Sequence, residues 1–436
     1  MTQDLTLHAP FFPGHATPTS INNNPMRRKV AGITPWRVVL FASGAIIAFA
    51  PFVTGTIEPV AVLALTVFLA ILSLWLRQPH IALDPASKGV ISSAAFLAFH
   101  AVMMSALGFA SIRPPGSIAP TDTLLSLYRT VALVLLYALV CRHIARPSRR
   151  FWMLGAIFAI ILAHATFALL REVAEQGGLS GPFVNRNSFA SFIGMGILVG
   201  LSLSISARRW QGQKLDLAVR LAGLWVANGL LVAALVLTQS RMGVTATCLG
   251  AAVLLVHRAA WKEALLLAGV LAAALVWFGP DLLGRFGFLP DDLSMRLLLY
   301  GQIYDMIATR PFTGYGAGTF ALAFEAYHAP PLPVEFIWDR AHSTYLKLWA
   351  ENGVFFGSIP ILGGFILALR LAARRGTSRH QGSGCTSVAL AALVLCASHS
   401  VFDFSFELLG NQVVLVALLA LGTPGTGCNP KEIQGE

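Results

Sequence analysis

The chain has 436 residues, of which 56% are hydrophobic and 12% charged, and its formal net charge at pH 7 is +11. Soluble domains carry about 25% charged residues, so a water-soluble fold of this composition would lack a solvated surface. The composition excludes a soluble enzyme and predicts an all-α integral membrane protein. Since no basic domain stands clear of the apolar segments, the positive charge does not indicate nucleic-acid binding.

The N-terminal segment is polar. Residues 1–35 are interrupted by Pro and Asn and carry a basic cluster at Arg27, Arg28 and Lys29, which predicts a disordered cytoplasmic tail. Ala48-Phe49-Ala50 resembles a signal-peptide cleavage site. Because Pro51 follows it and the polar lead is long, we interpret this segment as a retained helix.

Apolar segments fill most of the remaining chain. A membrane-spanning helix needs about 20 apolar residues. Residues 36–279 are predicted to hold nine such helices and residues 353–422 three more, with a second cytoplasmic tail at 423–436. The twelve predicted spans are 36–54, 58–76, 89–110, 122–141, 151–170, 187–206, 221–239, 242–257, 262–279, 353–371, 385–402 and 408–422.

The distribution of basic residues predicts the orientation. With the N-terminus inside, about two thirds of the Lys and Arg residues fall on the cytoplasmic side, as the positive-inside rule requires. Both termini are then cytoplasmic. The longest connection, residues 280–352, becomes a large loop on the outer face.

This loop has helical signals of its own. Pro290-Asp291-Asp292 predicts a helix start, since acidic residues favour a helix N-terminus. An apolar stripe then predicts an amphipathic helix on the membrane surface, and its members are Leu293, Leu297, Tyr300, Tyr304 and Ile307. A glycine-rich turn, PFTGYGAGTF at 311–320, precedes a second helical stretch that carries His342 and Tyr345 on one face.

Several arginines gather on the predicted outer face. Arg186 lies between Asn185 and Asn187 in GPFVNRNSFA, Arg241 lies in the short turn TQSRMG, and Arg296 lies on the amphipathic helix. A guanidinium presents a planar fork that matches phosphate oxygens two at a time. Basic residues at the outer lipid boundary therefore indicate an anionic ligand that arrives from the bilayer, such as a lipid pyrophosphate.

Each of these residues also has a structural interpretation. Arg241 can reach the interface and cap helix carbonyls, Arg296 can pair with Asp292, and Arg186 can be a flanking charge. Arg340 can pair with Asp339 or Glu335. That Arg186, Arg241 and Arg296 all fall on the same predicted side of the membrane is the stronger evidence for an anionic ligand.

Two further groups carry chemistry. His342 lies in a polar, helix-initiating context, and a neutral imidazole there can accept a proton or simply cap the helix. Asp403 and Glu407, in HSVFDFSFE, are interpreted as structural hydrogen-bonding groups or as contacts to an acceptor sugar. The chain has no HExxH motif, no Asp-x-Asp metal motif and no P-loop, so we predict no metal and no cofactor.

The order of these motifs resembles the O-antigen ligase and polymerase superfamily. The resemblance is carried by GPFVNRNSFA, SRMG, an arginine-bearing amphipathic helix, RPFTGYGAGTF, AHSTYLKLWAENG and HSVFDF, over about residues 180–360 and 399–404. One departure is Ser343, where many relatives have Asn after Ala-His. The first 170 residues match only as a series of spans.

The resemblance implies a function. Such proteins are metal-independent glycosyltransferases of the bacterial inner membrane, which move a glycan from undecaprenyl pyrophosphate to an acceptor on the periplasmic side. Arg241 and Arg296, with Arg186, would hold the pyrophosphate, and His342 would act as general base. Asn185, Asn187, Tyr345 and Asp403 are possible substrate contacts.

The resemblance leaves the acceptor open. In a ligase the acceptor is lipid A-core. Three alternatives are a polymerase of O-antigen or exopolysaccharide, a protein O-glycosyltransferase, and a lipid-linked glycan transporter without catalysis.

Overall fold

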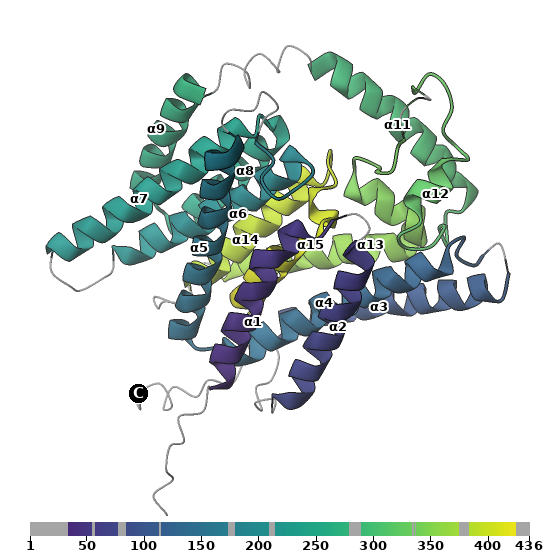
Figure 1. The fold of residues 1–436 in the computed structure, drawn as a ribbon, viewed down its shortest axis with the longest axis horizontal. Coiled ribbons are helices and arrows are strands. Elements are labelled where there is room, and N and C mark those ends of the chain that lie inside the picture. Colours follow the sequence, from purple (N-terminus) through teal and green to yellow (C-terminus); the bar gives the residue numbers. More distant parts are fainter. Residues whose placement is uncertain are drawn as a thin grey trace, which may run out of the picture. The chain divides into compact units, whose positions relative to one another are not determined.

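The described part of the chain is helical and contains no strand (Figure 1). The computed structural model describes residues 34–54, 57–76, 84–112, 115–172, 179–208, 214–278, 289–333, 335, 337–374 and 383–423. Its helices are α1 Pro35–Phe49, α2 Glu58–Trp75, α3 Pro85–Phe109, α4 Pro120–His143, α5 Pro147–Glu172, α6 Arg186–Ala207, α7 Lys214–Leu237, α8 Arg241–Arg258, α9 Trp261–Phe278, α11 Leu289–Thr309, α12 Phe320–Phe324, α13 Thr344–Ala373, α14 Ser383–His399 and α15 Leu409–Gly422, with short 3-10 turns η1 Ala50–Phe52 and η4 Ser405–Glu407. The predicted tails lie almost wholly outside these ranges.

Eight helices within the described ranges are long and apolar enough to cross a membrane: α1 (extended through η1), α2, α3, α4, α5, α6, α7 and α13. Two shorter apolar helices, Gly384–His399 and Leu409–Gly422, follow them. Each predicted span coincides with a helix, so the all-α polytopic class is confirmed. The count of twelve spans stays a prediction.

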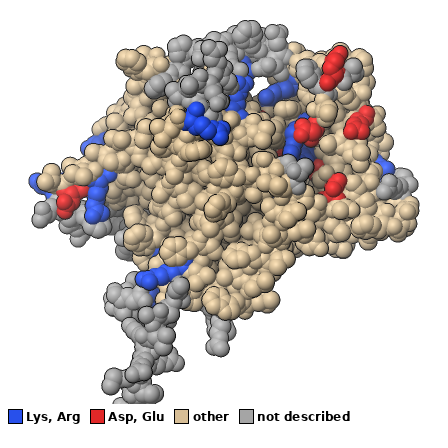
Figure 2. All heavy atoms as spheres, in the orientation of Figure 1, with Lys and Arg blue, Asp and Glu red and all other residues tan. Residues whose placement is uncertain are grey.

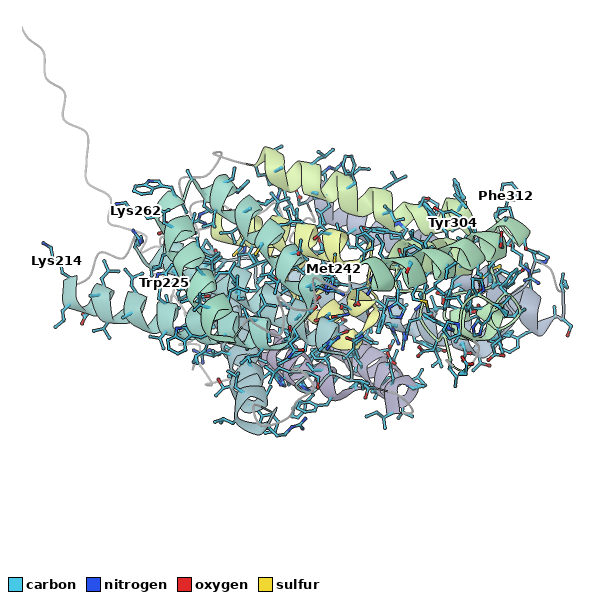
Figure 3. The ribbon with its side chains drawn as sticks, turned by 90° about the horizontal axis from the view of Figure 1, so that it is seen from above. Lys214, Trp225, Met242, Lys262, Tyr304 and Phe312 are labelled. Atoms are coloured by element: carbon cyan, nitrogen blue, oxygen red, sulfur yellow. The ribbon has the colours of Figure 1, made fainter. Side chains whose placement is uncertain are left out.

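The outer surface agrees with lipid solvation. Large apolar side chains stay exposed on the helix sides, among them Leu74 at 86% and Trp277 at 79%. Figure 2 shows a face whose broad middle is almost free of charged side chains. In Figure 3, Lys214 and Lys262 lie toward one end of the view, and Tyr304 and Phe312 lie toward the other.

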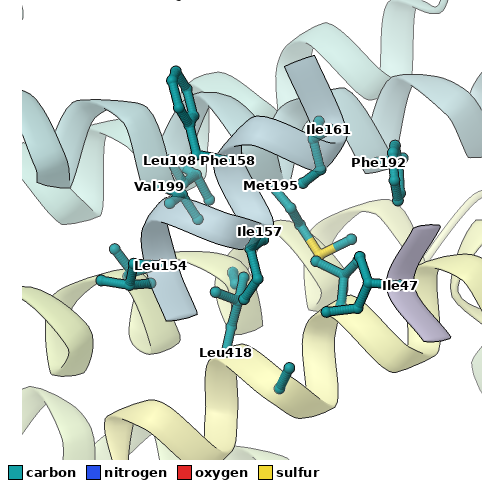
Figure 4. Close-up of a cluster of buried hydrophobic side chains, with 14 of the residues drawn as sticks. Ile47, Leu154, Ile157, Phe158, Ile161, Phe192, Met195, Leu198, Val199 and Leu418 are labelled. Atoms are coloured by element: carbon teal, nitrogen blue, oxygen red, sulfur yellow. The ribbon is translucent and has the colours of Figure 1, made fainter. Parts of the chain in front are cut away.

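Helix α6 forms the centre of the packing. Its apolar window is fully buried, and it contacts α5, α7, α8 and α14. In Figure 4, Ile157 and Ile161 of α5 face Met195 of α6, and Leu418 of α15 completes the cluster. Lipid tails are as apolar as leucine, so association of spans depends on close packing. The α6 sequence permits it, since a side-chain carbon at Gly200 would lie 2.3 Å from Asn228 Oδ1.

Helices α11 and α12 lie together beside the start of α13 (Figure 1). They share a second core that is separate from the main one and includes Leu299, Ile303, Met306, Phe320 and Phe324. The predicted outer loop, residues 280–352, therefore contributes to a core of its own.

The buried face of α11 differs from the predicted apolar stripe. Leu299, Ile303 and Met306 are buried, whereas Leu297 is 59% and Tyr304 56% exposed. The helix has two apolar sides, and periodicity alone does not tell which one meets protein.

Helix α13 begins before the predicted span at residue 353. One helix runs from Thr344 to Ala373, with a break at Gly353, whose φ is 73°. The glycine-rich turn packs into this break. Val354 N donates to Pro311 O (2.7 Å), and Gly316 N donates to Glu351 O (2.8 Å). Glu351 Oε1 also accepts from Phe320 N, at 3.1 Å, at the start of α12.

Replacing Gly353 with Ala is expected to destabilise the protein. With ψ at 163°, Gly353 lies in a region adopted essentially by glycine alone, where another residue costs about 1–3 kcal/mol, and the added carbon would lie 2.2 Å from Phe312 O. The thermal midpoint of purified protein in detergent should fall. Gly301→Ala is the matched control because a side-chain carbon there meets nothing within 4 Å. An equal midpoint for both variants would contradict a structural role for the break.

Candidate functional site

The starts of helices α6 and α8 are joined by a chain of hydrogen bonds. Asn185 is the N-cap of α6, and its side chain accepts from Asn187 N at 2.7 Å. Ser240 is the N-cap of α8 and accepts from Gly243 N at 3.1 Å. Ser240 Oγ donates to Asn187 Oδ1 at 2.8 Å. Asn187 Nδ2 in turn donates to Asp403 Oδ2 at 2.7 Å, so the loop between α14 and α15 joins the same assembly.

This arrangement gathers positive charge. Arg186 and Arg241 are the first residues of α6 and α8. A helix N-terminus carries a partial positive charge and backbone N–H groups that favour anions. Two such termini, each beginning with an arginine, therefore meet at Asn187.

Arg296 lies on the protein-facing side of α11. Its neighbours along the helix at Leu299 and Ile303 are buried, and its Nη1 donates to Phe402 O, just before Asp403. Asp292, the partner considered from the sequence, has a side chain outside the described residues. The contact of Arg296 with Phe402 brings the guanidinium to the α14–α15 loop.

Tyr300, one helical turn after Arg296, connects α11 to the histidine. Its hydroxyl donates to His342 O at 2.8 Å. Burial raises the pKa of Tyr300, while the charge of Arg296 and a hydrogen bond with it lower that pKa. The sequence placed Tyr300 only on an apolar stripe. Its spacing of four residues from Arg296 was the signal that both share one face.

His342 precedes helix α13 and does not cap it. The N-cap is Ser343, and His342 has a φ of 49°. Its ring contacts Phe404 at 5.3 Å and Trp338 at 6.3 Å, both edge to face. Its buried Nδ1 has no hydrogen-bond partner among the described residues. Within the described residues, this ring nitrogen of His342 is therefore not bonded to protein.

The electrostatic surroundings favour a neutral His342. Burial lowers its pKa most, and the Arg296 charge lowers it further. Asp403, Asp339 and Glu407 act in the opposite direction but do not outweigh these two effects. A neutral imidazole at pH 7 can accept a proton.

The two carboxylates of the α14–α15 loop are buried and bonded to protein. Asp403 is fully buried and also accepts from Ser405 N at 2.8 Å. Glu407 accepts from Lys347 Nζ at 2.7 Å. Both groups hold elements together, which agrees with the structural interpretation of the sequence.

Tyr345 and Arg340 have structural partners. The Tyr345 hydroxyl donates to Ala397 O of α14 at 2.8 Å, whereas His342 lies before the helix, so the two do not share a helical face. Arg340 Nε lies 3.5 Å from Asp339 Oδ2, as considered from the sequence, and its Nη1 lies 3.6 Å from Glu407 Oε2.

The described chain is therefore a polytopic α-helical membrane protein with a polar, positively charged site built from helix starts and one loop. Residues 226–361 match the family described as O-Antigen ligase. This part of the chain is therefore similar to the O-antigen ligase family. The comparison with curated proteins gave no match.

The matched region covers roughly a third of the chain and includes Arg241, Arg296 and His342. Arg186 and Asp403 lie outside it. Among the residues that the structure describes, no three His, Cys, Asp or Glu side chains are grouped so as to hold a metal ion.

Proposed function

We propose that this protein is a metal-independent glycosyltransferase of the O-antigen ligase type. It moves a glycan from undecaprenyl pyrophosphate to a hydroxyl group of lipid A-core, at the periplasmic face of the bacterial inner membrane. The observation that carries the proposal is the assembly at Asp403. Asn187, which joins the starts of α6 and α8, bonds to Asp403, while Arg296 bonds to the adjacent residue, Phe402.

The chemistry follows from the residue types. The acceptor oxygen attacks the anomeric carbon of the donor glycan and passes its proton to the His342 imidazole. The bond between that carbon and the pyrophosphate oxygen breaks, and the electron pair leaves with the pyrophosphate. With the base and the leaving group on opposite sides of the carbon, the step inverts the anomeric configuration.

The arginines act on the leaving group. Its negative charge grows as the bond breaks, so fixed guanidinium groups stabilise the transition state more than the ground state. Arg241 and Arg296, supported by Arg186, are assigned this role. Asn185 and Asn187 use their side chains on protein partners, so we assign them to positioning the two helix starts.

The rate of transfer should depend on pH through His342. A general base works only when it is neutral, so activity is lost as pH falls through the pKa of His342. Burial and Arg296 lower that pKa, so the acidic limb of the rate profile should lie below the usual histidine value. A limb at or above that value would contradict the assignment.

The proposal is tested by reconstituting the wild-type protein in lipid. Undecaprenyl-pyrophosphate-linked glycan is added with lipid A-core, and products are followed by gel and mass spectrometry. Glycan on lipid A-core identifies a ligase. A longer lipid-linked glycan with unmodified core identifies a polymerase instead, and glycan on a supplied protein acceptor identifies a protein O-glycosyltransferase. Movement of the lipid-linked glycan without any product would favour a transporter.

A further inference from the structure

The turn that carries His342 adopts a conformation that its own sequence disfavours. His342 has a φ of 49°, a region that residues other than glycine adopt uncommonly. Such a conformation costs about 1–3 kcal/mol and persists only where the surroundings enforce it. The residues on either side, Ala341 and Ser343, are 0% and 4% exposed. Contacts from outside the turn therefore hold it, and one of them is the Tyr300 hydroxyl, which donates to His342 O at 2.8 Å.

Glu407 contacts the residues that flank this turn. Its Oε2 accepts from Lys347 Nζ at 2.7 Å and lies 3.6 Å from Arg340 Nη1. Its Oε1 accepts from Thr344 Oγ1 at 3.3 Å. Arg340 precedes His342 in the chain, while Thr344 and Lys347 follow it. One carboxylate thus closes the segment on both sides of the histidine.

Glu407 is itself fixed. Its carbonyl oxygen accepts from Arg129 Nη1 at 3.1 Å, and Arg129 forms an ion pair with Glu58 of α2. Its backbone N donates to Phe404 O at 2.8 Å. Helices α2 and α4 therefore hold the backbone of Glu407, and the residue is only 6% exposed.

We propose that Glu407 is a positioning residue, whose carboxylate holds Arg340, Thr344 and Lys347 so that the His342 imidazole faces the acceptor. This inference rests on the proposed function. It assigns to Glu407 a role in the reaction that goes beyond stabilising the fold.

The charged and titratable groups around His342 come from every neighbouring element. Helix α11 contributes Arg296 and Tyr300, and the preceding loop contributes Asp339 and Arg340. Helix α13 contributes Lys347 and Glu351, which lie 4.0 Å apart. Asp403 and Glu407 of the α14–α15 loop also act on His342, and the charge of Asp403 acts on His399 of α14 as well.

Glu407→Gln is the first test. The amide keeps the size of the side chain but loses its charge, so the turn is held less firmly. Misplacing a reacting group by about 1 Å can lower the rate about 10²-fold, and we expect kcat to fall about that much with the donor KM unchanged. Glu407 raises the pKa of His342, so its removal should also move the acidic limb of the rate profile to lower pH.

Asp339→Asn is the matched control. Asp339 also raises the pKa of His342, but its side chain is 63% exposed and lies 3.5 Å from Arg340 Nε. We expect its acidic limb to move while kcat stays near the wild-type value. An equal loss of kcat in both variants would mean that Glu407 acts only through its charge, as Asp339 does, and would overturn the positioning role.

Folding is controlled with the double variant Glu407→Gln/Lys347→Met, which removes both members of the ion pair between Lys347 and Glu407. Full retention of kcat in this variant would overturn the proposal. The proposal would also be overturned if kcat fell only in proportion to the amount of folded protein and the acidic limb of the rate profile stayed at the wild-type pH.

A second readout does not need turnover. Diethyl pyrocarbonate reacts with neutral imidazole, and mass spectrometry of the His342 peptide gives its rate against pH. The midpoint of that curve should fall in Glu407→Gln relative to the wild type, and an unchanged curve would contradict the contact. If the wild-type protein transfers no glycan, the proposed function fails by itself, whatever this curve shows.

Discussion

Replacing His342 with Ala is expected to lower the rate of glycan transfer about 10²–10⁴-fold, the usual contribution of a general base. The acceptor hydroxyl then has no neutral imidazole to take its proton. The arginines remain in place, so binding of the lipid pyrophosphate donor should be retained. Initial rates in reconstituted lipid measure the loss of transfer, and a donor-binding assay in the same lipid measures whether binding is retained.

The control for this variant is His328→Ala. The Nε2 atom of His328 contacts Pro333 O at 3.1 Å, and its ring packs on Trp338. Its loss should leave the rate close to that of the wild type. Wild-type turnover by the His342 variant would remove this residue from the chemistry.

Replacing Arg296 with Ala should lower the rate about 10²–10³-fold, the usual effect of losing one preorganised donor to a developing charge. Arg296→Lys restores the charge but not the planar fork, so only part of the rate should return. The Phe402 contact is also lost in the Ala variant. Thermal midpoints are therefore measured together with the rates.

Arg310→Lys separates this effect from the general loss of an arginine. The Arg310 guanidinium lies over the Tyr315 ring, at 4.7 Å from its centroid, and donates to Gly116 O at 3.4 Å. It thus has a comparable structural contact outside the Asp403 assembly. If both arginine-to-lysine variants lost the same fraction of activity, the pyrophosphate role of Arg296 would be wrong.

The helical class could be predicted because lipid solvation leaves a direct signal in composition. Every predicted span coincides with a helix because apolar runs of this length have no other stable form in a bilayer. The face of α11 that meets protein could not be predicted, since both Leu297 and Leu299 are apolar. The bond between Arg296 and Phe402 joins residues 106 positions apart, a distance that local patterns do not encode.

Some residues of the candidate site could be predicted from the sequence for a chemical reason. Arg241 and His342 are polar residues next to apolar spans, so they attract attention even in one sequence. Glu407 was noticed only as half of a carboxylate pair. Its significance depends on Lys347, 60 positions away, and on the unusual φ of His342, which sequence does not reveal.

The enclosure of α6 has a consequence for how the protein is made. One of its partners is α14. Ser202 of α6 donates to Gly384 O of α14, and these residues are 182 positions apart, so α14 is synthesised much later than α6. Until then its serines and glycines must face lipid or other temporary neighbours. Asp403 emerges later still, so a chain stopped before this point has the arginines but no completed site. A chain that ends before α14 therefore lacks the contact between Asn187 and Asp403.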